Sequence, residues 1–149
     1  MGQIGVGVYG HNEESFLAAL RAAHIETVID IRRFRGLRGP KYRWANSSAL
    51  QSLLKSAGLQ YLHAIELSPT KELRAIQKLS DVRDGVSKAM RSELNTAFIA
   101  GYRSLVSPYL TNAYLDSLPK SAAFLCVERT DEACHRSVLL AMLREVADD

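Results

Sequence analysis

The feature that most constrains the fold is an alternation of short apolar segments with longer stretches of helical periodicity. The apolar segments read as buried strands, since they are rich in β-branched or small apolar residues and end in polar turns: residues 4–9, 27–31, 59–62 and 122–127. Strands joined through helices pair in parallel by right-handed crossovers. The sequence therefore predicts an α/β fold, a mainly parallel four-stranded sheet flanked by helices in a Rossmann-like three-layer arrangement.

Helices are predicted between these strands and after the last one. They cover residues 12–23, 46–58, 69–79, 86–105 and 108–118, with a final helix from about residue 131. Asp131 is a suitable N-cap, which would put Cys134, His135 and Arg136 in the first turn of the final helix. At 149 residues, with no linker or low-complexity tract, the chain is expected to form one domain, 1–149.

The composition narrows the setting of the protein. Two cysteines do not make a disulfide framework, which favours a reducing, cytoplasmic environment. The N-terminus lacks the basic and apolar regions of a signal peptide, and no apolar run is long enough to span a bilayer. We therefore expect a cytoplasmic protein that does not act at a membrane.

Positive charge is concentrated in one segment. Residues 32–43 hold six cations and no acid, whereas the remaining thirteen basic residues are outnumbered by sixteen acidic ones. The cations alternate with aromatic residues, a mixture that contacts phosphates and stacks bases. The residues predicted to bind nucleic acid are Arg35, Arg38, Lys41, Tyr42 and Arg43.

Unusual polar residues follow the predicted strands. In parallel sheets, ligands bind outside the carboxyl ends of the strands, where the strand order reverses. One cleft is therefore expected to gather residues from four separate segments: His11, Arg32, Arg33, Glu128, Cys134, His135 and Arg136.

The start of the final helix would favour an anion, because its first N–H groups lack partners and carry partial positive charge. The same field lowers the pKa of a thiol. Cys134 is therefore either a nucleophile or redox thiol, or a small buried residue that packs the helix start. Cys126 is expected in the core, and a disulfide between the two is the other arrangement.

The remaining site residues each have two interpretations. His135 and His11 are candidate acid–base groups, or form structural hydrogen bonds. Arg32 and Arg136 would bind a phosphate, although Arg136 alternatively pairs with Asp30 or Glu128. Asp30 is expected to fix an arginine or to accept from backbone N–H groups.

No metal or cofactor is expected from the sequence. The glycines of residues 5–10 fit a dinucleotide-binding pattern, but they lie inside a strand instead of following one. No Cys/His spacing is typical of zinc, and no Walker loop is present.

Several motifs of this chain resemble those of the DUF488 family, a domain of unknown function. They are Gly10-His11 after the first strand, Asp30-Ile31-Arg32 after the second, Gly39-Pro40-Lys41-Tyr42, Gly58-Leu59-Gln60-Tyr61, and Leu125-Cys126-Val127-Glu128 with Cys134-His135-Arg136. The resemblance implies an α/β fold and leaves the biochemical role open.

Two functions remain after these observations. The first is binding of a phosphate-bearing ligand in the cleft, and an enzyme of this kind would be a hydrolase or transferase acting on a nucleotide or nucleic acid. In that case Cys134, His135 and His11 are the candidate catalytic residues, and Arg32, Arg136, Glu128 and Asp30 the candidate anion-binding ones. The alternative is a nucleic-acid-binding module without chemistry that uses the basic segment. A third interpretation makes the Cys-His-Arg motif a structural brace.

Overall fold

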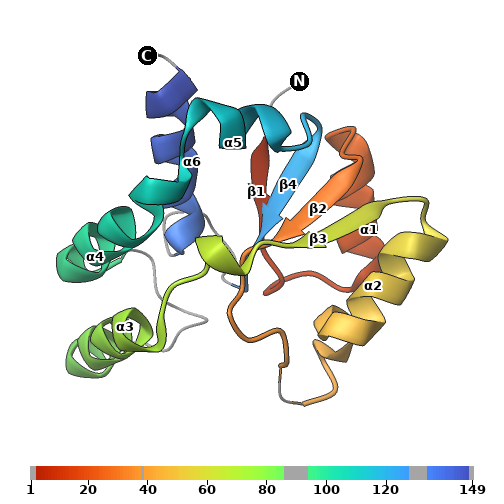
Figure 1. The fold of residues 1–149 in the computed structure, drawn as a ribbon. Helices are drawn as coiled ribbons and strands as arrows, with labels where there is room; N and C mark the ends of the chain where they lie inside the picture. Colours follow the sequence, from red (N-terminus) through yellow and green to blue (C-terminus); the bar gives the residue numbers. More distant parts are fainter. Residues whose placement is uncertain (1–2, 38, 86–93, 128–133, 148–149) are drawn as a thin grey trace.

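The computed structural model describes residues 3–37, 39–85, 94–127 and 134–147. Its centre is a four-stranded sheet of β1 (Ile4–Val6), β2 (Thr27–Asp30), β3 (Gln60–His63) and β4 (Ala122–Leu125) (Figure 1). The strand order is β1-β4-β2-β3, and every pair of neighbours is parallel. The predicted parallel α/β sheet is confirmed.

Helices cover both faces of this sheet. Helices α1 (Glu13–Ala22) and α2 (Ser47–Ser56) pack on one face, and α4 (Thr96–Val106) and α6 (His135–Ala147) pack on the other (Figure 1). Side chains along a strand alternate between the two cores: Val28 points to the α1–α2 side and Ile29 to the α4–α6 side. Burial on both faces is why the central strands β2 and β4 read as continuous apolar runs, whereas the edge strands β1 and β3 are partly exposed.

Helix α3 (Lys71–Asp84) lies outside these layers and packs on α4 (Figure 1). Leu73 of α3 contacts α4 at Gly101, where a side chain would collide with it. Leu73 is the one α3 residue in the buried apolar core, and the other buried α3 residues, Gln77, Ser80 and Asp81, are polar. Gly85, with φ of +71°, ends the helix in the left-handed conformation that glycine adopts without strain.

Several helix boundaries differ from those predicted, and α3 continues to Asp84 where the prediction ended it at residue 79. Helix α4 begins only at Thr96, because the Asn95 side chain accepts hydrogen bonds from the N–H groups of Ala97 and Phe98 and so caps it. The predicted region 108–118 contains a 3-10 turn, Ser107–Tyr109, and then the short helix α5 (Asn112–Ser117). Helix α6 begins at His135, so Cys134 precedes it. Residues 86–93 and 131–133 lie outside the described part.

The sheet order places a crevice next to β2 and β4. These strands are neighbours, but α2 follows β2 on one face and α6 follows β4 on the other. The chain therefore diverges at their carboxyl ends, which is where parallel α/β proteins bind ligands.

Candidate functional site

A buried ion pair fixes the end of β2. The Asp30 carboxylate is fully buried and accepts hydrogen bonds from Nε and Nη2 of Arg32 at 2.9 and 2.8 Å, and from the Arg32 backbone N–H at 3.1 Å. The Tyr61 hydroxyl donates to the same carboxylate at 2.7 Å. Paired hydrogen bonds of this kind hold a guanidinium in one orientation. The Arg32 side chain, which is 2% exposed, therefore has a fixed position.

Further contacts surround this pair. Nη1 of Arg35 donates to the Tyr61 hydroxyl at 3.2 Å, and Nε2 of His63 donates to the Arg32 carbonyl at 2.7 Å. Burial raises the pKa of Tyr61; the hydrogen bond from Arg35 opposes that shift, and the hydrogen bond to Asp30 adds to it. Residues of β2 and β3 and of the segment that follows β2 thus form one network at the edge of the crevice.

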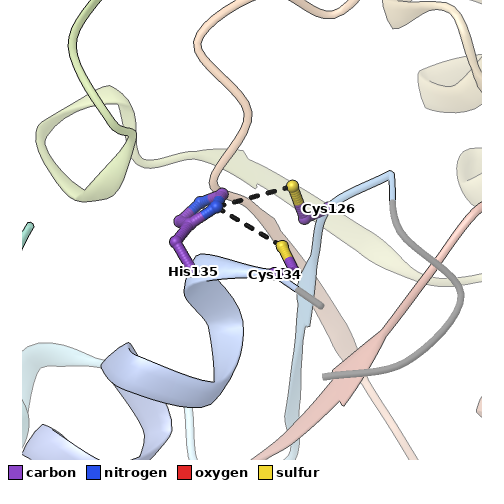
Figure 2. A group of neighbouring side chains, drawn as sticks. All are labelled: Cys126, Cys134 and His135. Atoms are coloured by element: carbon purple, nitrogen blue, oxygen red, sulfur yellow. Dashed lines mark hydrogen bonds between the residues drawn. The ribbon is translucent and has the colours of Figure 1, made fainter. Parts of the chain in front are cut away.

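A second cluster lies between β4 and α6. Figure 2 shows the Cys126 and Cys134 thiols converging on the His135 ring, with Sγ-to-Nδ1 distances of 3.7 and 3.4 Å. The other ring nitrogen, Nε2, lies 3.0 Å from the carbonyl oxygen of Ile31. Because a carbonyl only accepts, Nε2 carries the proton, and in the neutral ring Nδ1 turns its lone pair toward the thiols. We call Cys126, Cys134 and His135 the Cys-Cys-His cluster.

Tyr102 of α4 supports this cluster from the helical layer. Its ring packs edge-on against His135 with centroids 5.1 Å apart, and its hydroxyl donates to the Leu67 carbonyl at 2.6 Å. Burial, followed by the nearby thiols, raises the pKa of Tyr102 well above its usual value. The phenol therefore stays protonated, and the imidazole is held between an aromatic wall and the end of β2.

The crevice contains a cavity of about 600 Å³. Cys126, Val127 and His135 line it from the β4–α6 side, and apolar side chains of Phe34, Val82, Leu94 and Phe98 form other parts of its wall. Five cations and one acid complete the charged lining that the structure describes: Arg32, Arg33, Lys71, Arg74, Lys78 and Asp81. The volume is typical of small-molecule sites, and the excess of positive charge favours an anion.

Two of these cations are held in place by the wall itself. Arg33 donates through Nε to the Pro69 carbonyl at 2.8 Å, and the Arg74 guanidinium lies 4.7 Å from the centre of the Phe34 ring. Nη1 of Arg32 is buried and has no hydrogen-bond partner among the described residues. A buried donor without a partner raises the free energy of the folded chain. Binding of an acceptor that reaches this nitrogen would therefore be favourable.

The structure does not bring all the predicted site residues to this cavity. Arg32 and His135 line it, whereas His11 lies on the other face of the sheet, with Nδ1 3.0 Å from the Ser15 hydroxyl and its ring against Phe16. Cys134 and Arg136 are 1% and 0% exposed and are not part of the described lining. Glu128 falls outside the described residues.

The basic segment is only partly available to a ligand. Lys41 and Arg43 line a smaller hollow near the start of α1, and Arg38 lies outside the described residues. The Tyr42 hydroxyl accepts from the Gly10 N–H at 3.1 Å, and Trp44 is 8% exposed. These two aromatic rings are therefore already engaged by the fold.

Sequence reasoning missed the cations of α3 and the position of Cys126. Lys71, Arg74 and Lys78 are spaced three and four residues apart, which places them on one helix face. That spacing was the available signal, but it is equally typical of a solvated surface. Cys126 was expected in the core, and it is buried, yet it also lines the cavity.

Comparisons with known proteins identify the family. No curated protein and no solved structure matches the chain. No helix of the described part is both long and apolar enough to traverse a bilayer. One family model, described as a domain of unknown function, matches residues 12–143, and the chain therefore belongs to the DUF488 family.

Proposed function

We propose that the protein binds a small phosphate-bearing molecule of the nucleotide class in the cavity at the carboxyl ends of β2 and β4. The observation that carries the proposal is the lining: five cations and one acid among the described residues, in a chain with a net charge of only +3. Arg32 is held by Asp30 at the end of β2 and Arg33 by the Pro69 carbonyl, whereas Lys71, Arg74 and Lys78 come from α3. Arginine forks and lysine ammonium groups are the usual partners of phosphate oxygens.

The apolar part of the wall supports a ligand larger than phosphate itself. Phe34 is 60% exposed at the rim, and Phe98 lies deeper, at 3% exposed. An aromatic ring offers a stacking surface to a base, while the cations bind the phosphate. A nucleoside monophosphate has both a base to stack on these rings and a phosphate for the cations to bind.

The reaction class proposed for this ligand is hydrolysis or group transfer. His135 and Cys126 are the groups of the Cys-Cys-His cluster that line the cavity. His11 lies on the other sheet face, so this proposal gives it no part in the reaction. The basic segment receives no separate nucleic-acid function here, because Tyr42 and Trp44 are packed into the fold.

Calorimetric titration with a nucleoside monophosphate, with the nucleoside alone as reference, tests the proposal. We expect binding of the phosphate ester that weakens with salt, and little binding of the nucleoside. An exposed ionic contact contributes up to about 1 kcal/mol, and reversal replaces attraction with repulsion. Arg74→Glu or Lys78→Glu should therefore each weaken binding by roughly tenfold.

The matched control is Lys55→Glu, a reversal at an exposed lysine of α2 on the opposite sheet face. It should leave the affinity unchanged apart from a small long-range effect. Equal affinity for the nucleoside and its phosphate would contradict the proposal. So would a loss of binding in Lys55→Glu as large as in Arg74→Glu.

A further inference from the structure

We propose that the Cys-Cys-His cluster binds a transition-metal ion of the zinc class, with a coordination position open to the cavity. Sγ of Cys126, Sγ of Cys134 and Nδ1 of His135 all lie within 4.8 Å of one another. Two thiolates and an imidazole are donors that select Zn²⁺ or Co²⁺ over Mg²⁺ and Ca²⁺. This inference goes beyond the proposed anion ligand and does not depend on it.

The distances fit a shared metal. With Zn–S of about 2.3 Å, Zn–N of about 2.0–2.1 Å and a tetrahedral angle, the sulfur and nitrogen ligand atoms should lie about 3.6 Å apart. The observed separations from Nδ1 are 3.7 Å for Cys126 and 3.4 Å for Cys134. Both sulfur-to-nitrogen separations are therefore within a few tenths of an ångström of the value for a shared metal, and the two sulfurs lie within 4.8 Å of each other.

The histidine is already prepared as a ligand. Nε2 donates to the Ile31 carbonyl at 3.0 Å, which leaves Nδ1 unprotonated in the neutral ring and aims it at the thiols. Metal-binding histidines usually carry such a hydrogen bond on the second nitrogen, because it fixes both tautomer and ring orientation. A single lone pair accepts one good hydrogen bond, whereas one metal ion satisfies the nitrogen and both sulfurs.

Burial is compatible with a bound ion. Cys126, Cys134 and His135 are 5%, 1% and 4% exposed, so two isolated thiolates here would be costly. A divalent ion with two thiolates and a neutral imidazole has no net charge, which removes most of that cost.

The cavity lies next to the remaining coordination position. Cys126 and His135 line it, whereas Cys134 is 1% exposed and is not part of the described lining. Among the described residues the cluster supplies three ligands. Three protein ligands with an open position are typical of catalytic zinc sites, whereas structural sites have four.

The experiment is a Co²⁺ titration of the full-length chain, stripped of metal and kept reduced in the absence of phosphate. We expect one Co²⁺ per chain, thiolate-to-cobalt charge-transfer absorption, visible bands of tetrahedral intensity, and displacement by Zn²⁺. Cys126→Ser and Cys134→Ser should each diminish the charge-transfer band and weaken binding by at least roughly tenfold. The matched control is His11→Ala, a histidine outside the cluster, which should bind Co²⁺ like the wild type.

Absence of the charge-transfer band in the reduced wild-type chain would overturn the inference, as would wild-type binding by both serine variants. If the serine variants do not fold, as judged by circular dichroism, the band of the wild type and its loss on cysteine alkylation decide the question alone. Nucleotide titration of the metal-free chain separates this inference from the proposed function, because either can fail while the other holds.

Discussion

The buried ion pair at the end of β2 gives the sharpest stability prediction. Asp30 is fully buried and accepts three hydrogen bonds from Arg32 and one from Tyr61. Asp30→Asn keeps the side-chain shape, but it removes the charge and turns one acceptor oxygen into an NH₂ donor. The Arg32 guanidinium would then remain buried beside a group that repels one of its N–H donors.

The cost of leaving one member of a buried pair uncompensated is about 3–5 kcal/mol. A domain of this size is stable by about 5–15 kcal/mol in total, so the loss is large. With an m-value of about 2 kcal/mol/M, the urea midpoint of unfolding should fall by roughly 1.5–2.5 M. Equilibrium urea unfolding followed by circular dichroism measures this shift.

Two further variants test whether the loss of stability comes from the uncompensated Arg32 guanidinium. Tyr61→Phe removes one hydrogen bond from the same carboxylate at a half-buried position and should cost about 1–2 kcal/mol. The double variant Asp30→Leu, Arg32→Met replaces both charges with apolar groups and should recover much of the stability lost in Asp30→Asn. A change below about 1 kcal/mol in Asp30→Asn would refute the reasoning, because it would mean that the buried guanidinium does not need its counter-ion.

Three further predictions concern groups elsewhere in the fold. Burial raises the pKa of Tyr102 and Tyr114 above the usual 10.0, so the folded chain binds these protons more tightly than the unfolded chain. The free energy of unfolding should therefore fall as pH rises above about 10, which urea unfolding at several pH values would show. Asn95→Ala removes the cap of α4 and should cost about 1 kcal/mol in the same assay. Glu145→Gln should change stability by less than about 1 kcal/mol, and less still at high salt, because its pair with Arg103 is exposed.

The sheet and the edge that carries the cavity were predictable from local patterns. Four apolar runs separated by helical periodicity leave few arrangements besides a parallel sheet, and all its neighbouring strands are parallel. The same reasoning placed Arg32 and His135 at one edge, where both line the cavity. Asn12, of a residue type favoured at helix N-caps, caps α1 by accepting from the Ser15 N–H.

What remained unpredictable depended on which sheet face each connection takes. His11 was expected in the same cleft as Arg32, but the chain turns after β1 toward the α1 face, and His11 packs there against Phe16. Lys71 and Lys78 were not predicted as site residues. They line the cavity because α3 packs on α4 beside the crevice. Long-range packing of this kind leaves no periodic pattern in the sequence.

The positions of the two cysteines were also only partly predictable from the sequence. Helix α6 begins one residue after Cys134, so that thiol lies just before the first helical turn and not within it. Cys126 follows β4 and reaches the cavity wall. A shift of a few residues in a helix start is within the error of sequence patterns, and of the two cysteines Cys126 is the one in the described lining of the cavity.

The weak attachment of α3 has a consequence for local unfolding of the molecule. One leucine anchors this helix to the apolar interior, so its backbone amides should exchange with deuterium sooner than those of β2 and β4. Transient detachment of α3 would swing three lysine and arginine side chains outward while the sheet stays intact. The cavity between α3 and the sheet would then open through local unfolding of α3, with no need for the central strands to separate.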